Sequence, residues 1–233
     1  MSMGIYLLLI LLGLVIGSFA GAVTWRIPKG EDFVLGRSYC DSCKKELRWS
    51  DNIPLFSFLL YQGKSRCCSK KIGLRYPLIE VSMAIGFVFL FLSSLSPLYY
   101  ALYAISLVIF VIDLEHQIIP DELTWVLLLF GLYSASNILF ANLFAGFFVA
   151  LLLLLLYLLT LGRGIGLGDV KLAIPLGMLL GFEKGLTFII LSFVIGGLIA
   201  MVLLILKKAT MKSKIAFGPF MIISFWMIML FIK

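Results

Sequence analysis

The sequence predicts an all-α polytopic membrane protein with about eight transmembrane helices and a cytosolic insert after the first helix. Two observations lead to this fold class. Of the 233 residues, 62% are hydrophobic and only 13% are charged, which leaves too few polar side chains to cover the surface of a soluble domain. The apolar residues also form long runs, and a helix that crosses a bilayer needs about 20 such residues.

Uncharged stretches divide the chain into these helices. The first is expected over residues 4–25, and because no basic residue precedes it we interpret it as a retained transmembrane helix, with a cleaved signal peptide as the alternative. The 32 uncharged residues between Glu80 and Asp113 are enough for two helices joined by a turn at Ser93–Pro97. The other spans are expected on either side of Asn137 and Asn142, from Asp169 to about Glu183, from there to about Leu206, and from about Ile215 to Ile232.

The basic residues indicate how the helices are oriented. Of the 19 Lys and Arg residues, 11 lie between Arg26 and Arg75, and four more lie between the last two spans. Basic residues are retained on the cytoplasmic side, so eight helices with an external N-terminus place both blocks in the cytoplasm. The net charge of +7 therefore indicates a membrane face and no nucleic-acid partner.

Three parts of the chain follow from this orientation. Residues 1–25 form the first transmembrane helix, and residues 26–76 form the cytosolic insert with all four cysteines. Residues 77–233 form a seven-helix membrane region that carries the candidate catalytic residues. The partner common to the helical parts is the lipid bilayer.

Two acidic residues, Asp113 and Asp169, differ from the other charged residues near helix ends. The span count places both at the cytosolic edge of the membrane, beside apolar sequence. Ionisable residues at such positions are candidates for a functional site. Two neighbouring carboxylates share a proton, so that one can activate water while the other polarises a peptide carbonyl. The pair predicts peptide hydrolysis that needs no cofactor.

Asp169 follows a segment, residues 162–168, with glycine at every second position. This spacing is not a helical repeat, so we expect an irregular loop whose backbone can approach a substrate closely. A phosphate-binding loop is an alternative, but the Gly-Lys-Ser/Thr ending of such loops is missing from the sequence.

Two motifs around these acids resemble a known family. Gly166-Leu167-Gly168-Asp169 resembles the GxGD signature of intramembrane aspartyl peptidases, and residues 112–121 (IDLEHQIIPD) resemble the first-aspartate motif of bacterial prepilin peptidases, also called type 4 prepilin leader peptidases. Further segments that resemble this family occur in order along the chain: Gly17-Ser18-Phe19, Arg26-Ile27-Pro28, Arg37-Ser38-Tyr39-Cys40, Pro54–Ser57, Arg75–Glu80 and Phe217-Gly218-Pro219.

The resemblance implies an enzyme of the bacterial plasma membrane whose catalytic residues, Asp113 and Asp169, face the cytoplasm. Its substrates are type IV prepilins or pseudopilins, which lose a short basic leader just after a glycine. The resemblance also implies N-methylation of the new N-terminus with S-adenosylmethionine. Residues expected to bind substrate or support the loop are Gly166, Gly168, Lys171, Glu80 and Glu115.

Further acidic residues lie close to the two candidate catalytic positions. Glu80, Glu115, Asp121 and Glu122 are expected to surround the entrance, where they either attract the basic leader or form an ordinary solvated rim. Asp121 follows Ile119-Pro120, which favours a helix-capping role over catalysis.

The four cysteines of the insert are Cys40, Cys43, Cys67 and Cys68. Two C-x-x-C pairs would supply the four thiolates of a zinc site. However, the second pair is adjacent, and Lys70 stands where the family resemblance places a fourth cysteine. Zinc binding therefore stays open beside a metal-free insert with reduced thiols, and a disulfide is disfavoured in the cytoplasm. The metal-free insert would pack around Trp49, Leu55, Phe56, Phe58 and Tyr61.

Two other functions are compatible with a pair of membrane acids. A cation-coupled membrane transporter would use Asp113 and Asp169 to bind the cation, but both acids lie at one edge of the membrane and no polar path continues outward. A structural assembly protein would instead pair the acids with lysines.

Overall fold

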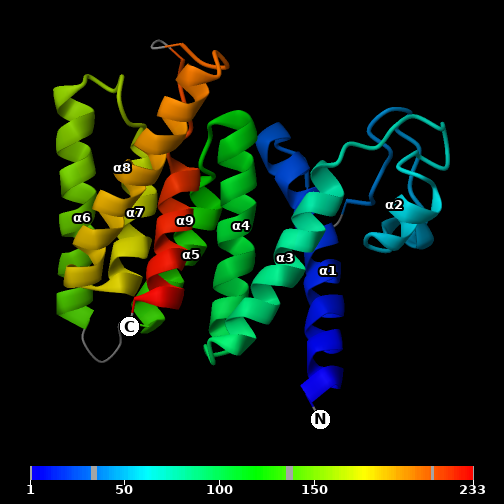
Figure 1. Cartoon of the computed structure of the whole chain (residues 1–233), viewed down its shortest axis with the longest axis horizontal. Helices are drawn as coiled ribbons and strands as arrows, with labels where there is room; N and C mark the ends of the chain where they lie inside the picture. Colours follow the sequence, from blue (N-terminus) through cyan, green and yellow to red (C-terminus); the bar gives the residue numbers. More distant parts are fainter. Residues whose placement is uncertain (1, 33–35, 135–138, 211–212, 233) are drawn as a thin grey trace. The chain divides into compact units, whose positions relative to one another are not determined.

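The structure of the chain is a computed structural model that describes residues 2–32, 36–134, 139–210 and 213–232. The regular elements of this described part are all helical, as Figure 1 shows. The α-helices are α1 (Ser2–Arg26), α2 (Phe56–Leu60), α3 (Arg75–Leu92), α4 (Leu98–His116), α5 (Asp121–Ser134), α6 (Leu139–Leu159), α7 (Leu167–Leu180), α8 (Phe182–Ile205) and α9 (Gly218–Phe231), and the short 3-10 helices are η1 (Ile27–Lys29) and η2 (Trp49–Asn52).

The helices have the length and composition of membrane spans. Five helices of the described part, α1, α3, α4, α6 and α8, are long and apolar enough to cross a bilayer. Many of their large apolar side chains are exposed, among them Phe147 and Leu151 on α6 and Ile190 and Val194 on α8. Contiguous apolar exposure of this kind suits a lipid environment. The protein is an all-α polytopic membrane protein, as the sequence predicts.

The count of eight spans stays a prediction. Helices α5, α7 and α9 have 14 residues each, fewer than the roughly 20 that an untilted span requires. The predicted turn at Ser93–Pro97 is confirmed, since α3 ends at Leu92 and α4 begins at Leu98. The predicted division near Asn137 and Asn142 is confirmed to within a few residues, since α5 ends at Ser134 and α6 begins at Leu139; Asn142 itself lies in the first turn of α6, and Asn137 lies outside the described residues.

The chain forms two compact units, residues 1–108 and 109–233. In the first unit α1 packs along α3 through glycines. A Cβ atom at Gly13 would lie 2.5 Å from Cα of Ala84, and one at Gly17 would lie 2.6 Å from Cα of Glu80. Only glycine allows two helix backbones to approach so closely, as in other membrane helix pairs. The three-part division at residues 25 and 76 concerns function and stays a prediction.

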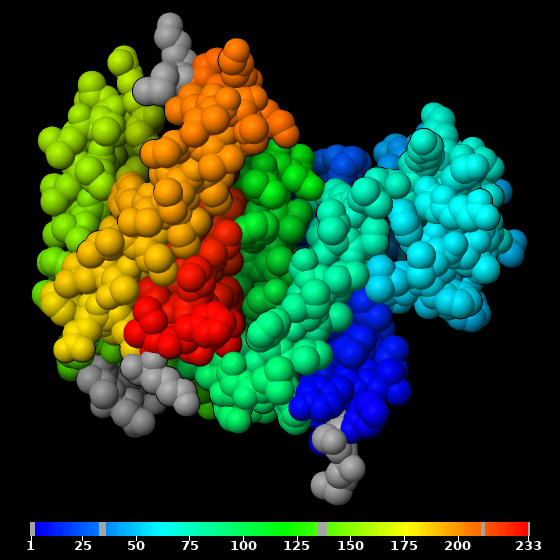
Figure 2. Space-filling model, viewed as in Figure 1, coloured from blue at the N-terminus to red at the C-terminus, as the bar shows by residue number. Residues whose placement is uncertain are grey.

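The insert between α1 and α3 forms a small lobe beside these two helices (Figure 2). Its described residues form almost no apolar core. Among its described residues, 27–32 and 36–74, only Cys40 and Ser65 are buried. Trp49 and Phe56, two members of the core that a metal-free insert would need, are exposed. Leu55, Phe58 and Tyr61 are half-buried, so the most buried point of the described insert lies at Cys40 and Ser65.

The second unit is a bundle in which α7 contacts α5, α6, α8 and α9 (Figure 1). Close packing again relies on glycine: a Cβ at Gly146 of α6 would lie 2.5 Å from the carbonyl oxygen of Ile174 on α7. Most of helix α7 is buried, with Leu172, Ala173 and Leu176 fully enclosed. This central helix carries Asp169 in its first turn, so the bundle fixes the position of that residue.

Candidate active site

Asp113 lies in the last turn of α4, in the part of that helix that belongs to the second unit. Ile112 before it is fully buried, and Asp113 itself is only 4% exposed. The N–H of Gln117 donates to the Asp113 carbonyl and ends the helix there. A carboxylate is costly to bury unless other groups compensate for its lost hydration.

Asp169 is held by the glycine-rich loop and the first turn of α7. The loop is irregular, as predicted, and Gly162 has a φ of 72°, a conformation that favours glycine. Helix α7 begins at Leu167, and the N–H of Gly166 donates to Oδ2 of Asp169 at 3.0 Å. A Cβ at Gly166 would lie 3.3 Å from this oxygen. The first glycine of the motif therefore binds the carboxylate through its backbone.

The two carboxylates lie close enough for the charge of Asp113 to act on Asp169. The backbone N–H of Gly218, at the start of α9, faces both of them. A Cβ at Gly218 would lie 2.5 Å from Oδ2 of Asp113. Ile119 fills the space beside them, since it would be 3.2 Å from a Cβ at either Gly168 or Gly218. Residues from three helices and two loops thus meet at one point.

The electrostatic surroundings of this pair favour one negative charge. Helices α7 and α9 both present their N-termini to it, where the helix dipole and free N–H groups stabilise an anion. Oδ2 of Asp113 is buried and accepts no hydrogen bond of good geometry from the described residues. An unpartnered buried carboxylate oxygen is costly. A proton shared between Asp113 and Asp169 would satisfy it.

Two of the other predicted residues, Lys171 and Glu115, lie near this pair but point outward. Lys171 donates to both carboxylate oxygens of Asp121, at 2.8 and 2.9 Å. This ion pair joins the start of α7 to the start of α5, where Asp121 is the first helical residue and also interacts favourably with the helix N-terminus. Glu115 is exposed in the last turn of α4. Asp121 is therefore a structural partner of Lys171.

Glu80 belongs to the first unit and is buried on α3. Its Oε2 accepts a hydrogen bond from the N–H of Leu55, which has a φ of 56°. This bond attaches the insert to α3. A buried side chain cannot act as a solvated rim charge, so Glu80 fits the role of loop support better than that of attracting a leader by long-range charge.

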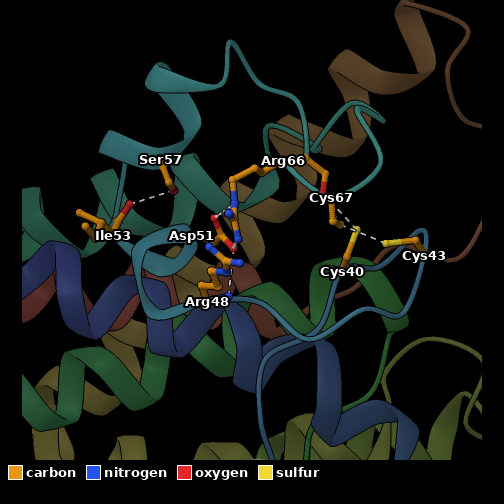
Figure 3. Close-up of polar contacts among 9 residues, drawn as sticks. Cys40, Cys43, Arg48, Asp51, Ile53, Ser57, Arg66 and Cys67 are labelled. Carbon is orange, nitrogen blue, oxygen red and sulfur yellow. Dashed lines mark hydrogen bonds and ion pairs between the residues drawn. The ribbon is translucent and has the colours of Figure 1, made fainter.

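The structure brings all four cysteines together. Their Sγ atoms lie within 4.8 Å of one another, although Cys67 and Cys68 are adjacent in sequence. Cys40 Sγ is 3.7 Å from Cys68 Sγ, and Cys43 Sγ is 3.0 Å from Cys67 Sγ. Figure 3 shows Cys40, Cys43 and Cys67 pointing toward one another. Tetrahedral zinc with Zn–S bonds of about 2.3 Å separates sulfurs by about 3.8 Å, so the donor set fits the metal.

The hydrogen bonds in this cluster alter the thiol pKa values. Burial opposes ionisation of Cys40, but hydrogen bonds from Ser65 and from the N–H groups of Cys43 and Ser42 outweigh it and lower its pKa to about 6. The hydrogen bond with Cys67 raises the pKa of Cys43 to about 12. The cluster therefore already stabilises a thiolate, the form that binds metal.

Two residues of the aspartate site, Gly218 and Ile119, were not among the predicted site residues. Gly218 belongs to Phe217-Gly218-Pro219, a segment noted only for its family resemblance, and Ile119 is apolar. A signal existed for Gly218, because glycine followed by proline at the start of a helix suggests a backbone role. No sequence signal identifies Ile119, since its role depends on which glycines face it.

Comparison with known proteins places the chain in a family. Residues 11–94 match the model described as the bacterial Peptidase A24 N-terminal domain, and residues 100–201 match that of the type IV leader peptidase family. The chain belongs to the type IV leader peptidase family. The four cysteines of this chain lie in the first matched segment, and both Asp113 and Asp169 lie in the second.

Relatives named "Prepilin leader peptidase/N-methyltransferase" match most of the chain. The protein of Pseudomonas aeruginosa is 33% identical over 95% of this chain and 88% of its own length. That of Pectobacterium carotovorum subsp. carotovorum is 32% identical over 94% and 91%, and that of Klebsiella pneumoniae is 36% identical over 75% and 85%. No solved structure matches the chain.

Proposed function

We propose that this protein cleaves the basic leader from type IV prepilins or pseudopilins, with Asp113 and Asp169 as the catalytic pair. The observation that carries the proposal is the meeting of two buried carboxylates beside the N–H of Gly218. The names of the relatives support a prepilin substrate. They also favour hydrolysis over cation transport, the alternative for a pair of membrane acids.

The pair would work as a general acid and a general base. One carboxylate is ionised and takes a proton from the attacking water, while the other is protonated and donates a hydrogen bond to the scissile carbonyl. The tetrahedral intermediate then collapses, the peptide C–N bond breaks, and the leaving amine takes a proton from the pair. Titration belongs to the pair as a whole, so each aspartate is expected to be essential whichever role it takes.

We propose that this site faces the cytoplasm. The insert and the segment that precedes α9 carry most of the basic residues of the chain, and such segments are retained on that side. Gln117, just after Asp113, donates through Nε2 to the carbonyl of Lys214, which lies in the second basic segment. The acids are therefore next to a segment whose charge favours the cytoplasmic side.

Co-expression with a prepilin precursor, followed by mass spectrometry of its N-terminus, tests the peptidase. The wild type should remove the leader, and Asp113→Asn and Asp169→Asn should each lose cleavage. Asp121→Asn is the matched control, because it removes a nearby acid that pairs with Lys171 instead. Normal processing by either of the first two variants would contradict the paired-acid mechanism.

We further propose that the chain methylates the new N-terminal amine with S-adenosylmethionine. A cavity of about 180 Å³ in the first unit favours this second activity. It lies between the insert and the ends of α1 and α3, and it is lined by aromatic rings, including Trp25, Tyr39 and Tyr76. Basic side chains already lie over one face of these rings, with Lys29 over Trp25, Lys44 over Tyr39 and Arg75 over Tyr76, so the opposite faces are the ones that would bind a sulfonium or stack with adenine. The cavity is open to solvent on one side, so the parts of S-adenosylmethionine that it does not enclose can extend outward.

The charged residues of this cavity suit both reactants, S-adenosylmethionine and the amine that it methylates. Lys70 and Lys71 line it and can bind a carboxylate, while Glu80 is the buried acid in its wall. Its carboxylate accepts a hydrogen bond from the N–H of Leu55 and another from the hydroxyl of Ser18, and a carboxylate has further acceptor sites. S-adenosylmethionine supplies an electrophilic methyl group. The amine attacks only when neutral, and we assign to Glu80 the removal of its proton.

Glu80→Gln tests this assignment, because Gln retains the acceptor for Leu55. We expect cleavage to continue and methylation to fall by about 10²–10⁴-fold, the usual contribution of a general base. Glu46→Gln, at an exposed residue outside the cavity, is the control. Equilibrium binding of radiolabelled S-adenosylmethionine to each purified variant separates loss of binding from loss of the base. Full methylation by Glu80→Gln would contradict the role of Glu80.

A further inference from the structure

The insert contains the same backbone turn twice, 25 residues apart. In the first turn, the N–H of Cys40 donates to the Lys45 carbonyl and the N–H of Lys44 donates to the Cys40 carbonyl. In the second, the N–H of Ser65 donates to Lys70 and the N–H of Ser69 donates to Ser65. Every donor and acceptor of the first turn has its counterpart 25 positions later.

Two further observations support the same register. The flanking residues pair as an isolated bridge in both turns, Tyr39 with Glu46 and Lys64 with Lys71. The residue that follows Cys43 and the residue that follows Cys68 both have a positive φ, 59° at Lys44 and 57° at Ser69. Such values are uncommon outside glycine, so their recurrence at equivalent positions marks one turn type.

This register changes the interpretation of the cysteine pattern. Cys43 is equivalent to Cys68, and Cys40 is equivalent to Ser65, so the second turn reads Ser-x-x-Cys. The expectation that Lys70 replaces a cysteine is wrong, because Lys70 is equivalent to Lys45, which is not a cysteine either. The position that lacks its thiol is Ser65. Cys67, inside the second turn, has no cysteine counterpart in the first.

We propose that Cys67 supplies the fourth thiolate of a zinc site in place of Ser65. Its Sγ lies 3.0 Å from Cys43 Sγ and within 4.8 Å of the other two sulfurs. Ser65 keeps a supporting role, since its buried hydroxyl lies 3.3 Å from Cys40 Sγ and 3.1 Å from Cys67 Sγ. A hydroxyl placed in this way donates to a thiolate and orients it.

The described residues of the insert form almost no apolar core, which makes such a site important to it. Small domains that cannot bury enough apolar surface are commonly stabilised by a structural metal. Cys40 and Ser65, the two buried residues of the described insert, are the equivalent positions of the two turns. The centre of the insert is therefore the point where the two turns face each other, and Cys67 restores the donor that the second turn lacks.

Zinc and cobalt binding by the purified full chain test the proposal without reference to enzyme activity. The wild type should bind one zinc ion, and its cobalt form should show the absorption of a four-thiolate site. Cys67→Ser should weaken binding by more than the roughly 10–100-fold that loss of an outer partner costs, and should shift the cobalt spectrum toward three thiolates. Ser65→Ala should weaken binding within that 10–100-fold range and keep the four-thiolate spectrum.

The double variant Ser65→Cys/Cys67→Ser is the decisive comparison. It moves the thiol into the regular position, so zinc affinity and the four-thiolate spectrum should return to at least the wild-type level. Recovery would also show that Cys67→Ser alone fails through the lost ligand and not through misfolding. Wild-type affinity in Cys67→Ser, no recovery in the double variant, or no zinc binding by the wild type would each overturn the proposal.

Discussion

The aspartate site and the cysteine cluster are built in opposite ways. Asp113, Asp169 and Gly218 are far apart in sequence, and they meet because helices of the second unit pack closely around α7. The cysteines meet because one local turn occurs twice within 33 residues, with little apolar packing among the described residues around it. The first site depends on the bundle, whereas the second organises its own surroundings. Substitutions should therefore have effects of different kind and size in the two places.

The largest effect is expected where the paired carboxylates are altered together. Asp113→Asn/Asp169→Asn should lose about as much cleavage rate as either single variant, roughly 10²–10⁴-fold or more, because the two residues act as one unit. Single-turnover cleavage of a prepilin in detergent measures the three rates. If the two losses multiply in the double variant, the aspartates contribute independently, which would contradict the view that they act as one unit.

Gly218→Ala should have the next largest effect. The new Cβ would meet Oδ2 of Asp113 at 2.5 Å and Cδ1 of Ile119 at 3.2 Å, so the carboxylate must move. A displacement of this size in a catalytic group can reduce the rate about 10²-fold. Gly197→Ala on α8 is the matched control, since no atom lies within 4 Å of its Cβ and it should keep full activity. Equal activity of Gly218→Ala and Gly197→Ala would show that the backbone at Gly218 does not position the catalytic carboxylates.

Lys171→Ala should have a smaller effect. The ion pair with Asp121 is exposed, with 55% and 57% of the two side chains accessible, and such pairs contribute about 0–1 kcal/mol. We expect a lower melting temperature by a few degrees at most and a cleavage rate within several-fold of wild type. Thermal unfolding of the protein in detergent measures the first quantity. A loss comparable to that of Asp169→Asn would mean that Lys171 contacts the substrate.

The smallest effect is expected in the insert, at Asp51. Arg66 donates to both oxygens of Asp51, and the N–H of Arg48 donates to Oδ2 (Figure 3). The hydrogen bond from Arg66 is the largest cause that holds the pKa of Asp51 below its usual value, against the opposing effect of burial. The stabilisation is therefore complete above the ordinary aspartate pKa of about 3.9 and is lost as the pH falls through the lowered folded-state value.

Limited proteolysis of the insert across this acidic range measures the effect. The wild type should become more sensitive as the pH falls below about 4, and Asp51→Asn should already be slightly more sensitive at neutral pH with no further change from this residue. The same acid dependence in both proteins would show that Asp51 does not contribute.

Sequence reasoning succeeded where a pattern reports directly on local structure. Uncharged runs gave the helices, and Ser93–Pro97 gave a turn that the structure contains. Asn142 lies three residues inside α6 and not in the turn itself, because a polar side chain is tolerated near the end of a membrane helix. Counting the spans predicted that Asp113 and Asp169 lie at the same depth in the membrane. It could not predict that they meet, because the count does not say which helices are neighbours within the membrane plane.

The rest of both sites depends on information that residue types do not carry. Gly218 acts through its backbone, and its importance comes from which carboxylates that backbone faces. The register of the two turns is defined by hydrogen bonds between main-chain atoms, so counting cysteines alone led to Lys70 instead of Ser65. In both sites, the sequence does not show where the main-chain N–H and C=O groups lie in space.

The glycine contact between α1 and α3 links the apolar part of the first unit to its cavity. A side chain at Gly17 would collide with the backbone of Glu80, whose carboxylate holds Leu55 of the insert. Any tilt of α1 imposed by a thicker or thinner bilayer must therefore move α3 with it. If the cavity transfers methyl groups as proposed, a mutational screen would identify Gly17 as a methylation residue although it lines no part of the cavity. Membrane thickness would then be a variable that alters the second activity of the enzyme.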